Sequence, residues 1–193
     1  KSAIAIKPDY AEAHNNLGTI FAELKQFKNA EETFKQAILL NPNYAGAHYN
    51  LGNTLKDLRK IDEAEESFRK AIVINPNYAE AHNNLGNIMK SHDRLEDAEA
   101  SYRKAIALDP DYAEAHNNLG NIMKSHDRLE EAEACYRKAI AIKSDYAQAY
   151  SNLGANLKNL GKFEEAEACY RKAITLDQKY TQAHCNLCLI LYA

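Results

Sequence analysis

A motif that returns every 34 residues constrains this chain more than any other feature. The segment Ala-Glu-Ala-His-Asn-Asn-Leu-Gly begins at residues 11, 79 and 113, and close variants begin at residues 45, 147 and 181. Residues 79–112 and 113–146 differ at only five positions. A fixed period of this length is typical of solenoid proteins, in which each repeat packs against its neighbours.

Each repeat is predicted to contain two helices. In the third full repeat they cover residues 79–92 and 95–108, and both are rich in Ala, Leu, Glu, Lys and Arg, which favour helix. Proline at the first four junctions between repeats ends the helices, because it cannot continue a helix and disfavours the α region for the residue before it. No segment alternates like a strand. We therefore expect an all-α solenoid of antiparallel helix pairs.

Composition excludes several classes of protein. A net charge of −3 and a pI near 6.2 argue against a nucleic-acid partner, which usually requires a large basic excess. No apolar run is long enough to span a membrane, so we expect no membrane partner. The four cysteines lie in the last third of the chain, which argues against a disulfide framework and favours a cytoplasmic or nuclear location.

Several positions in each repeat resemble the tetratricopeptide repeat family. In the repeat that begins at Ala79, the family's packing positions match Leu85, Gly86, Ala98, Tyr102, Ala105 and Pro110. The same set recurs as Leu17, Gly18, Ala30, Phe34, Ala37 and Pro42, and as Leu51, Gly52, Ala64, Phe68, Ala71 and Pro76. The departures include Ser144 and Gln178 in place of proline and Cys188 in place of the packing glycine. The resemblance implies a right-handed solenoid whose first helices line a concave surface that binds protein or peptide.

We expect a single array over residues 1–193. Residues 1–10 are predicted to be the tail of a preceding repeat, and residues 181–193 the first helix of a sixth repeat. Five full repeats are predicted between them, at 11–44, 45–78, 79–112, 113–146 and 147–180. No predicted second helix covers the apolar residues Leu187, Leu189, Ile190 and Leu191, so we expect an exposed patch there that favours self-association.

One glycine recurs inside the first helix of five repeats, at Gly18, Gly52, Gly86, Gly120 and Gly154. Glycine in a helix interior costs about 1 kcal/mol relative to alanine. Because the glycine recurs opposite alanine and aromatic positions, we expect the partner helix to approach closely there.

An asparagine occupies the same position in all six copies, at Asn16, Asn50, Asn84, Asn118, Asn152 and Asn186. Asparagine is unfavourable inside a helix, so its recurrence requires an explanation. One interpretation is structural, with the side chains forming hydrogen bonds between neighbouring helices. The other is functional, with a ladder of carboxamides that offers donors and acceptors to the backbone of an extended peptide. The two interpretations are compatible.

A second polar group follows the asparagine ladder at steps of three residues, which places it on roughly the same helical face. It comprises Asn53, Asn87 and Asn121, and then Lys56, Lys90, Lys124 and Lys158. The functional interpretation is a peptide-binding groove with a row of lysines that favours acidic partners. The structural interpretation is a solvated charged face. On the second helix, Glu65, Glu66, Arg69 and Lys70 are predicted to be solvated outer surface.

Two more specific sites are disfavoured. Co-chaperone members of the family grip a terminal carboxylate with two asparagines and several cations, but here Asn83, Gln148 and Asn152 occupy the cationic positions. The histidines His14, His48, His82 and His116 recur one repeat apart, about 8–10 Å between helices, whereas zinc needs its ligands at about 2 Å. We therefore expect these histidines to pack and form hydrogen bonds between helices, and we expect no metal and no cofactor.

The sequence favours a protein-interaction scaffold that binds an extended peptide or partner protein in its concave groove. No phosphate-binding loop, nucleophile elbow or recurring acid pair indicates an enzyme. A second hypothesis is the substrate-recognition arm of a glycosyltransferase similar to O-GlcNAc transferase, whose repeat arm carries a comparable asparagine ladder. An engineered consensus scaffold is a third hypothesis, although the diverged fifth and sixth repeats argue against it.

Overall fold

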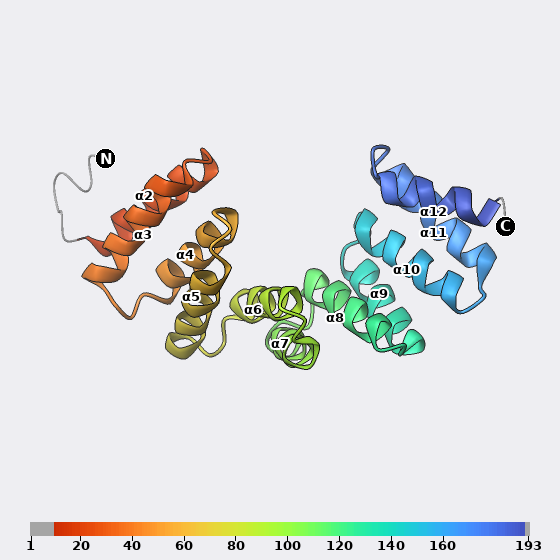
Figure 1. Cartoon of the computed structure of the whole chain (residues 1–193), viewed down its shortest axis with the longest axis horizontal. Helices are drawn as coiled ribbons and strands as arrows, with labels where there is room; N and C mark the ends of the chain where they lie inside the picture. Colours follow the sequence, from red (N-terminus) through yellow and green to blue (C-terminus); the bar gives the residue numbers. More distant parts are fainter. Residues whose placement is uncertain (1–9, 192–193) are drawn as a thin grey trace. The chain divides into compact units, whose positions relative to one another are not determined.

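The computed structural model describes residues 10–191, and within them the chain is helical without any strand (Figure 1). The helices are α2 (Ala11–Glu23), α3 (Phe27–Leu40), α4 (Ala45–Asp57), α5 (Ile61–Ile74), α6 (Ala79–Ser91), α7 (Leu95–Leu108), α8 (Ala113–Ser125), α9 (Leu129–Ile142), α10 (Ala147–Asn159), α11 (Phe163–Leu176) and α12 (Thr181–Leu191). The predicted all-α class is confirmed. Residues 1–9 of the predicted tail of a preceding repeat lie outside the described residues.

The chain divides into two compact units, Lys1–Asp93 and Arg94–Ala193. In the first unit α2 packs on α3 and α4 packs on α5, and each second helix also contacts the first helix of the next repeat. In the second unit the pairs are α8 with α9 and α10 with α11, α7 packs on α8, and α11 contacts α12. The second helices α3, α5, α9 and α11 therefore each lie between two first helices.

A residue in the left-handed conformation closes the turn inside each repeat. Arg59 has a φ of +62°, and its N–H donates to the carbonyl oxygen of Lys56 at 3.0 Å. The N–H of Lys60 donates to the carbonyl oxygen of Leu55 at 2.9 Å, which completes a Schellman motif and ends α4. The equivalent residues are Lys25, Asp93, Asp127 and Gly161. Because only the last of these is glycine, residue type alone does not reveal this turn.

Each repeat packs around an aromatic ring of its second helix. The rings of Phe34, Phe68, Tyr136 and Tyr170 are almost completely buried. A Cβ atom placed on Gly52 would lie 2.7 Å from Cε1 of Phe68, and one on Gly120 would lie 2.7 Å from Cε1 of Tyr136. Both distances are shorter than van der Waals contact, so only glycine allows this spacing. The predicted close approach is confirmed at Gly18, Gly52, Gly120 and Gly154.

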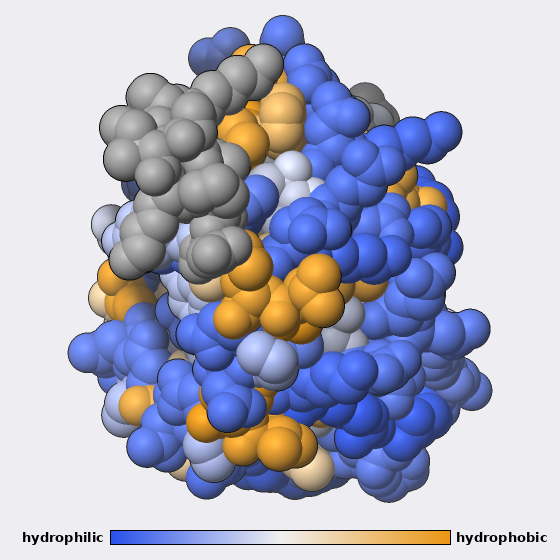
Figure 2. Space-filling view, turned by 90° about the vertical axis from the view of Figure 1, so that its left-hand side faces the viewer, coloured by the Kyte–Doolittle hydropathy of each residue, from blue (hydrophilic) through white to orange (hydrophobic). Residues whose placement is uncertain are grey.

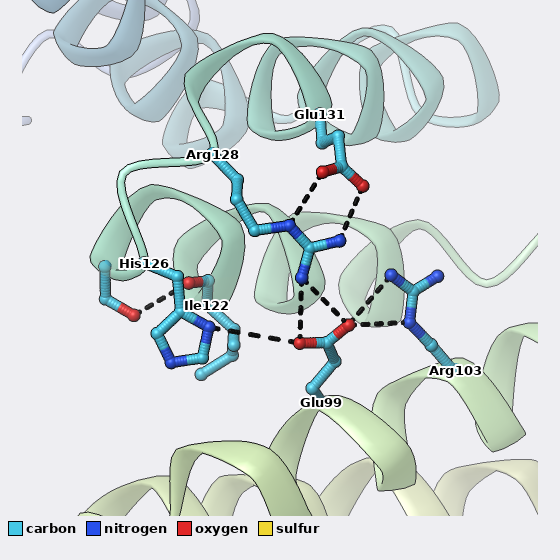
Figure 3. A network of polar contacts seen from close by, with 7 residues as sticks. Glu99, Arg103, Ile122, His126, Arg128 and Glu131 are labelled. Carbon is cyan, nitrogen blue, oxygen red and sulfur yellow. Dashed lines mark hydrogen bonds and ion pairs between the residues drawn. The ribbon is translucent and has the colours of Figure 1, made fainter.

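Ion pairs on the second helices connect one repeat to the next (Figure 3). Glu99 on α7 accepts a hydrogen bond from Arg103 at 2.8 Å and from Arg128, in the turn before α9, at 3.2 Å. Nδ1 of His126 lies 4.0 Å from the same carboxylate. Arg128 also binds Glu131 at 2.6 Å. One partly buried carboxylate therefore holds α7 to the following repeat.

The same arrangement recurs in other repeats. Glu31 pairs with Lys60 at 2.8 Å, and Glu133 pairs with Lys162 at 2.9 Å, each across 29 residues. We call the carboxylates Glu31, Glu99 and Glu133, with their cationic partners Lys60, Arg128 and Lys162, the outer ladder. Its carboxylates are 10–18% exposed, whereas isolated surface ion pairs are usually fully solvated.

The prediction that second-helix charges are merely solvated is wrong for Glu65. Its side chain is 18% exposed, lies 2.9 Å from Arg69 and approaches Nδ1 of His92 at 3.8 Å. The neighbouring Glu66 pairs with Lys70, and both of these side chains do lie in solvent. The two glutamates differ because adjacent residues lie on different faces of a helix.

Apolar side chains are exposed in both units. Figure 2 shows apolar patches within a hydrophilic surface on the side of the first unit that carries α2 and α3, and Ile20 on α2 is half exposed. On α12, Leu189 and Leu191 are exposed, as the sequence predicts, whereas Leu187 and Ile190 are half-buried.

The close helix contact makes a matched pair of substitutions informative. Gly52→Ala places a methyl group against the buried ring of Phe68, so we expect it to destabilise the protein by about 1–3 kcal/mol. Gly46→Ala lies in the same helix and meets only the half-buried Tyr44 ring at 3.2 Å. It should leave stability unchanged or raise it by up to about 1 kcal/mol. Urea unfolding measures both, and equal effects would contradict the packing argument.

The outer ladder predicts a pH dependence of stability. Partial burial favours a higher pKa for Glu99, but hydrogen bonds from Arg103 and Arg128 outweigh it and leave the pKa below its ordinary value of 4.5. A lowered folded-state pKa stabilises the protein above the unfolded pKa, and this contribution disappears as the pH falls through the folded pKa.

Glu99→Gln should therefore be destabilising at pH 7, and its difference from the parent protein should shrink below about pH 4. Glu96→Gln, in the same helix, is the control and should show a much smaller pH dependence. Unfolding free energies measured from pH 7 to pH 3 test this, and a constant difference for Glu99→Gln would contradict it.

Candidate functional site

The recurring asparagines of the first helices are only partly buried. Asn16 is exposed, and Asn50, Asn84, Asn118, Asn152 and Asn186 are half-buried. They lie on the same helices as the packing glycines, two residues earlier in the sequence. The side chains are therefore accessible in part while the helices that carry them are fixed by the core.

Three of these asparagines bond to the preceding repeat. Nδ2 of Asn50 donates to Oδ1 of Asn15 at 3.0 Å, and Nδ2 of Asn152 donates to Oδ1 of Asn117 at 2.9 Å, each across 35 residues. The structural interpretation of the ladder therefore applies at these positions. Within the described part of the chain, the amide oxygens of Asn50 and Asn152 accept no hydrogen bond, so they remain available to a ligand.

The second row of asparagines also has defined partners. Asn53 accepts a hydrogen bond from Nδ2 of Asn84 at 2.9 Å, and Asn121 accepts one from the hydroxyl of Tyr136 at 2.9 Å. Because the oxygen of each amide is occupied, its NH₂ group is the part left for another acceptor. Asn87 also has an interaction partner. The row therefore presents oriented donors rather than freely rotating amides.

The lysines of the first helices form no ion pair within 4.0 Å among the described residues. Lys56, Lys124 and Lys158 are half-buried, and Lys90 is exposed. Burial lowers the pKa of Lys56 and of Lys124, and the positive charge of Lys158 lowers the pKa of Lys124 further. At Lys56 the negative charge of Asp57 opposes this effect without outweighing it, and neither Lys56 nor Lys124 has a carboxylate within 4.0 Å among the described residues.

The cations on the second helices, and in the turns before them, behave differently. Most of them lie within 4.0 Å of a carboxylate: Lys35, Lys60, Arg69, Lys70, Arg94, Arg103, Arg128, Arg137, Lys138, Lys162 and Arg171. Lys28, Lys104 and Lys172 have no carboxylate that close among the described residues, but they are exposed, so half-burial without an ion pair distinguishes Lys56, Lys124 and Lys158.

The recurring histidines bond to the junctions between repeats. Nε2 of His48 lies 3.0 Å from the carbonyl oxygen of Pro42, and His82, His116 and His184 make the equivalent contact with the residue six positions earlier. The predicted hydrogen-bonding role applies to these histidines, although the partner is a loop carbonyl rather than a helix. Within residues 10–191, no group of three potential ligands is placed to hold a metal ion.

Sequence reasoning missed the buried amides that support the ladder. Asn117 and Asn156 are fully buried, and Nδ2 of Asn156 donates to the carbonyl oxygen of Leu129 at 2.7 Å. Nδ2 of Asn117 and Oδ1 of Asn156 have no hydrogen-bond partner. The sequence did contain one indication of the role of Asn117. It lies 35 residues before Asn152, which is one repeat length plus one residue. Asn156 carried none, because other repeats have isoleucine or threonine at its position.

Comparison with known proteins identifies the repeat. Models described as "Tetratricopeptide repeat" match residues 11–44, 45–78 and 147–180, and also 67–100, and a "TPR repeat" model matches 86–127 and 120–161. The models recognise the repeat itself and not a resemblance to the O-GlcNAc transferase arm. Comparison with curated protein sequences gives no match.

Several solved structures share the fold. YrrB, a TPR protein with an unusual peptide-binding site, is 21% identical with a TM-score of 0.73, and the alignment covers 94% of each chain. MamA is 28% identical with a TM-score of 0.73, covering 86% of this chain and 96% of MamA. PilF of Pseudomonas aeruginosa is 18% identical with a TM-score of 0.79, covering 95% of this chain and 89% of PilF. Among the described helices, none is long and apolar enough to cross a membrane.

The hydrogen bonds between repeats predict unequal effects of truncating the ladder. Asn152→Ala removes the donor to the buried amide of Asn117, so we expect a loss of about 1–3 kcal/mol in unfolding free energy. Asn16→Ala removes an exposed side chain and should be neutral or slightly stabilising, because alanine favours helix. Chemical denaturation compares them, and equal costs would show that the bond between repeats contributes little.

Proposed function

Because this chain belongs to the tetratricopeptide repeat family, we propose that it binds an extended, acidic segment of a partner protein on the surface of its first helices. The role is that of an interaction scaffold and not of an enzyme. In this proposal, residues 11–180 form one array of five repeats, flanked by partial repeats.

The unpaired lysines carry the proposal. Lys56, Lys124 and Lys158 are partly desolvated and have no carboxylate within 4.0 Å among the described residues, whereas most second-helix cations have one. A partner with acidic side chains would supply the missing counter-charges. Because burial lowers the pKa of Lys56 and Lys124, an acidic ligand would also favour their charged forms.

The asparagines supply contacts to the peptide backbone. The amide oxygens of Asn50 and Asn152 are available to accept N–H groups, and the amide nitrogens of Asn53 and Asn121 are available to donate to carbonyl groups. An extended peptide needs both kinds of partner. Three neighbouring first helices at about 8–10 Å spacing would contact about six residues of such a peptide within one unit.

The same fold is compatible with peptide binding, since YrrB has a peptide-binding site. The glycosyltransferase-arm hypothesis rests on the asparagine ladder alone. Most of the ladder amides, including those of Asn50, Asn84 and Asn152, already bond within the protein, so no specific observation favours it. Self-association through the exposed Leu189 and Leu191 of α12 is a further prediction of the proposal.

Substituting the lysines tests acidic binding more directly than substituting the asparagines, because truncating the asparagines also affects folding. We expect labelled 15-residue peptides with four Asp or Glu residues to bind more tightly than the same peptides with Asn or Gln at those positions. The quadruple Lys→Gln variant at positions 56, 90, 124 and 158 should lose this preference. Fluorescence anisotropy at increasing salt measures it, since exposed charges are screened over about 8 Å at physiological ionic strength.

The matched control changes four lysines of the second helices, Lys28, Lys104, Lys138 and Lys172, to Gln. This control changes the net charge by the same amount as the first-helix variant. It should retain the preference for acidic over neutral peptides. Equal binding of acidic and neutral peptides, or equal losses in the two variants, would contradict an acidic groove on the first helices.

A further inference from the structure

Three donor groups lie on two contacting first helices of the second unit, and none has an acceptor among the described residues. They are the amide nitrogen of Asn121 and the ammonium groups of Lys124 and Lys158, and we call them the donor triad. Asn121 and Lys124 are one turn apart on α8, and Lys158 occupies the equivalent position to Lys124 on α10, which contacts α8. No described carboxylate lies within 4.0 Å of either lysine.

A buried hydroxyl fixes the orientation of Asn121. Tyr136 is fully buried and donates from its hydroxyl to Oδ1 of Asn121 at 2.9 Å. Since the amide oxygen is occupied, the NH₂ group is the part of Asn121 left to bind another acceptor. The equivalent residues of the first two repeats are Phe34 and Phe68, which lack the hydroxyl, so this orienting bond is not required for the repeat to fold.

The two lysines influence each other. They occupy equivalent positions on two helices that are in contact, and the positive charge of Lys158 adds to the effect of burial in lowering the pKa of Lys124. Two like charges held together on a half-buried surface favour a ligand that carries two negative charges.

We propose that Asn121, Lys124 and Lys158 bind the phosphate group of a phosphorylated serine or threonine in the partner polypeptide. This inference rests on the proposed function and specifies its ligand. A phosphate monoester carries about −1.5 to −2 charge at pH 7 and three strong acceptor oxygens, which matches two ammonium groups and one amide donor. A carboxylate offers one charge and two oxygens and leaves part of the lysine repulsion in place.

A related set of residues occurs in the first unit. Oδ1 of Asn53 is occupied by Asn84, and Lys56 and Lys90 occupy the two lysine positions. In the fifth repeat Ala155 replaces the asparagine, so α10 and α12 do not form another such set. The donor triad is therefore a feature of particular repeats and not of the whole array.

The first experiment titrates the full chain with N-acetyl-phosphoserine N-methylamide and follows the lysine side-chain signals by NMR. The signals of Lys124 and Lys158 should shift saturably, and the pKa of Lys124 should rise. Binding should be at least about fivefold tighter than that of N-acetyl-glutamate N-methylamide at equal ionic strength, because the phosphate carries the second charge. The signal of Lys172, on α11, reports non-specific binding, and its shift should not saturate.

Two variants assign the effect to the donor triad. Lys124→Gln combined with Lys158→Gln should abolish the saturable response, while Lys172→Gln should not alter it. Tyr136→Phe, which matches the residue of the first two repeats, should preserve folding and weaken phosphoserine binding several-fold, because Asn121 loses its orienting bond.

The outcomes separate this inference from the proposed function. Equal binding of glutamate and phosphoserine, or equal shifts at Lys172 and Lys124, would overturn the phosphate site even if acidic peptides still bind. Saturable phosphoserine binding at the donor triad, together with no preference for acidic peptides, would support the phosphate site and contradict the general acidic groove.

Discussion

The contact between a glycine of the first helix and an aromatic ring of the second helix determines the geometry of four of the described repeats, at Gly18, Gly52, Gly120 and Gly154. With a hypothetical Cβ only 2.6–2.8 Å from the ring, no other residue permits the spacing without displacing a buried aromatic group. The contact fixes which stripe of the first helix is buried. The asparagines and lysines that share this helix are consequently held on its remaining surface, where their accessibility is set by the core and not by their own interactions.

The two helices of a repeat use charge in different ways. Second-helix carboxylates such as Glu99 are shared between a cation in the same helix and one in the next repeat, so their charges are compensated within the protein. First-helix lysines such as Lys124 are half-buried and have no such compensation. Ion pairing therefore joins neighbouring repeats through their second helices, whereas the half-buried lysines that lack a carboxylate partner lie on the helices proposed to bind a partner.

Much of the fold could be predicted from the sequence because it depends on local patterns. The helix boundaries follow proline and the apolar periodicity, and the glycine contact follows from its recurrence opposite aromatic positions. The outer ladder could not be predicted, since Glu31 and Lys60 meet only when two second helices stack in one particular register. For the candidate site, the sequence predicted the polar face, but nothing in it indicated a polar role for Tyr136, which lies at the aromatic packing position of its repeat. Its hydroxyl bond to Asn121 required the three-dimensional placement of both residues.

The constant 29-residue offset of the outer ladder makes the repeats interchangeable modules. Glu31 with Lys60 and Glu133 with Lys162 use the same offset although their surroundings differ in sequence. Insertion or deletion of one 34-residue unit would leave each glutamate facing a cation of the following unit. Unequal recombination between near-identical repeats, such as 79–112 and 113–146, would then change the number of repeats without creating an incompatible interface. The outer ladder in this sense tolerates changes in the number of repeats, and the proposed binding surface could be lengthened or shortened by genetic events that keep its ion pairs.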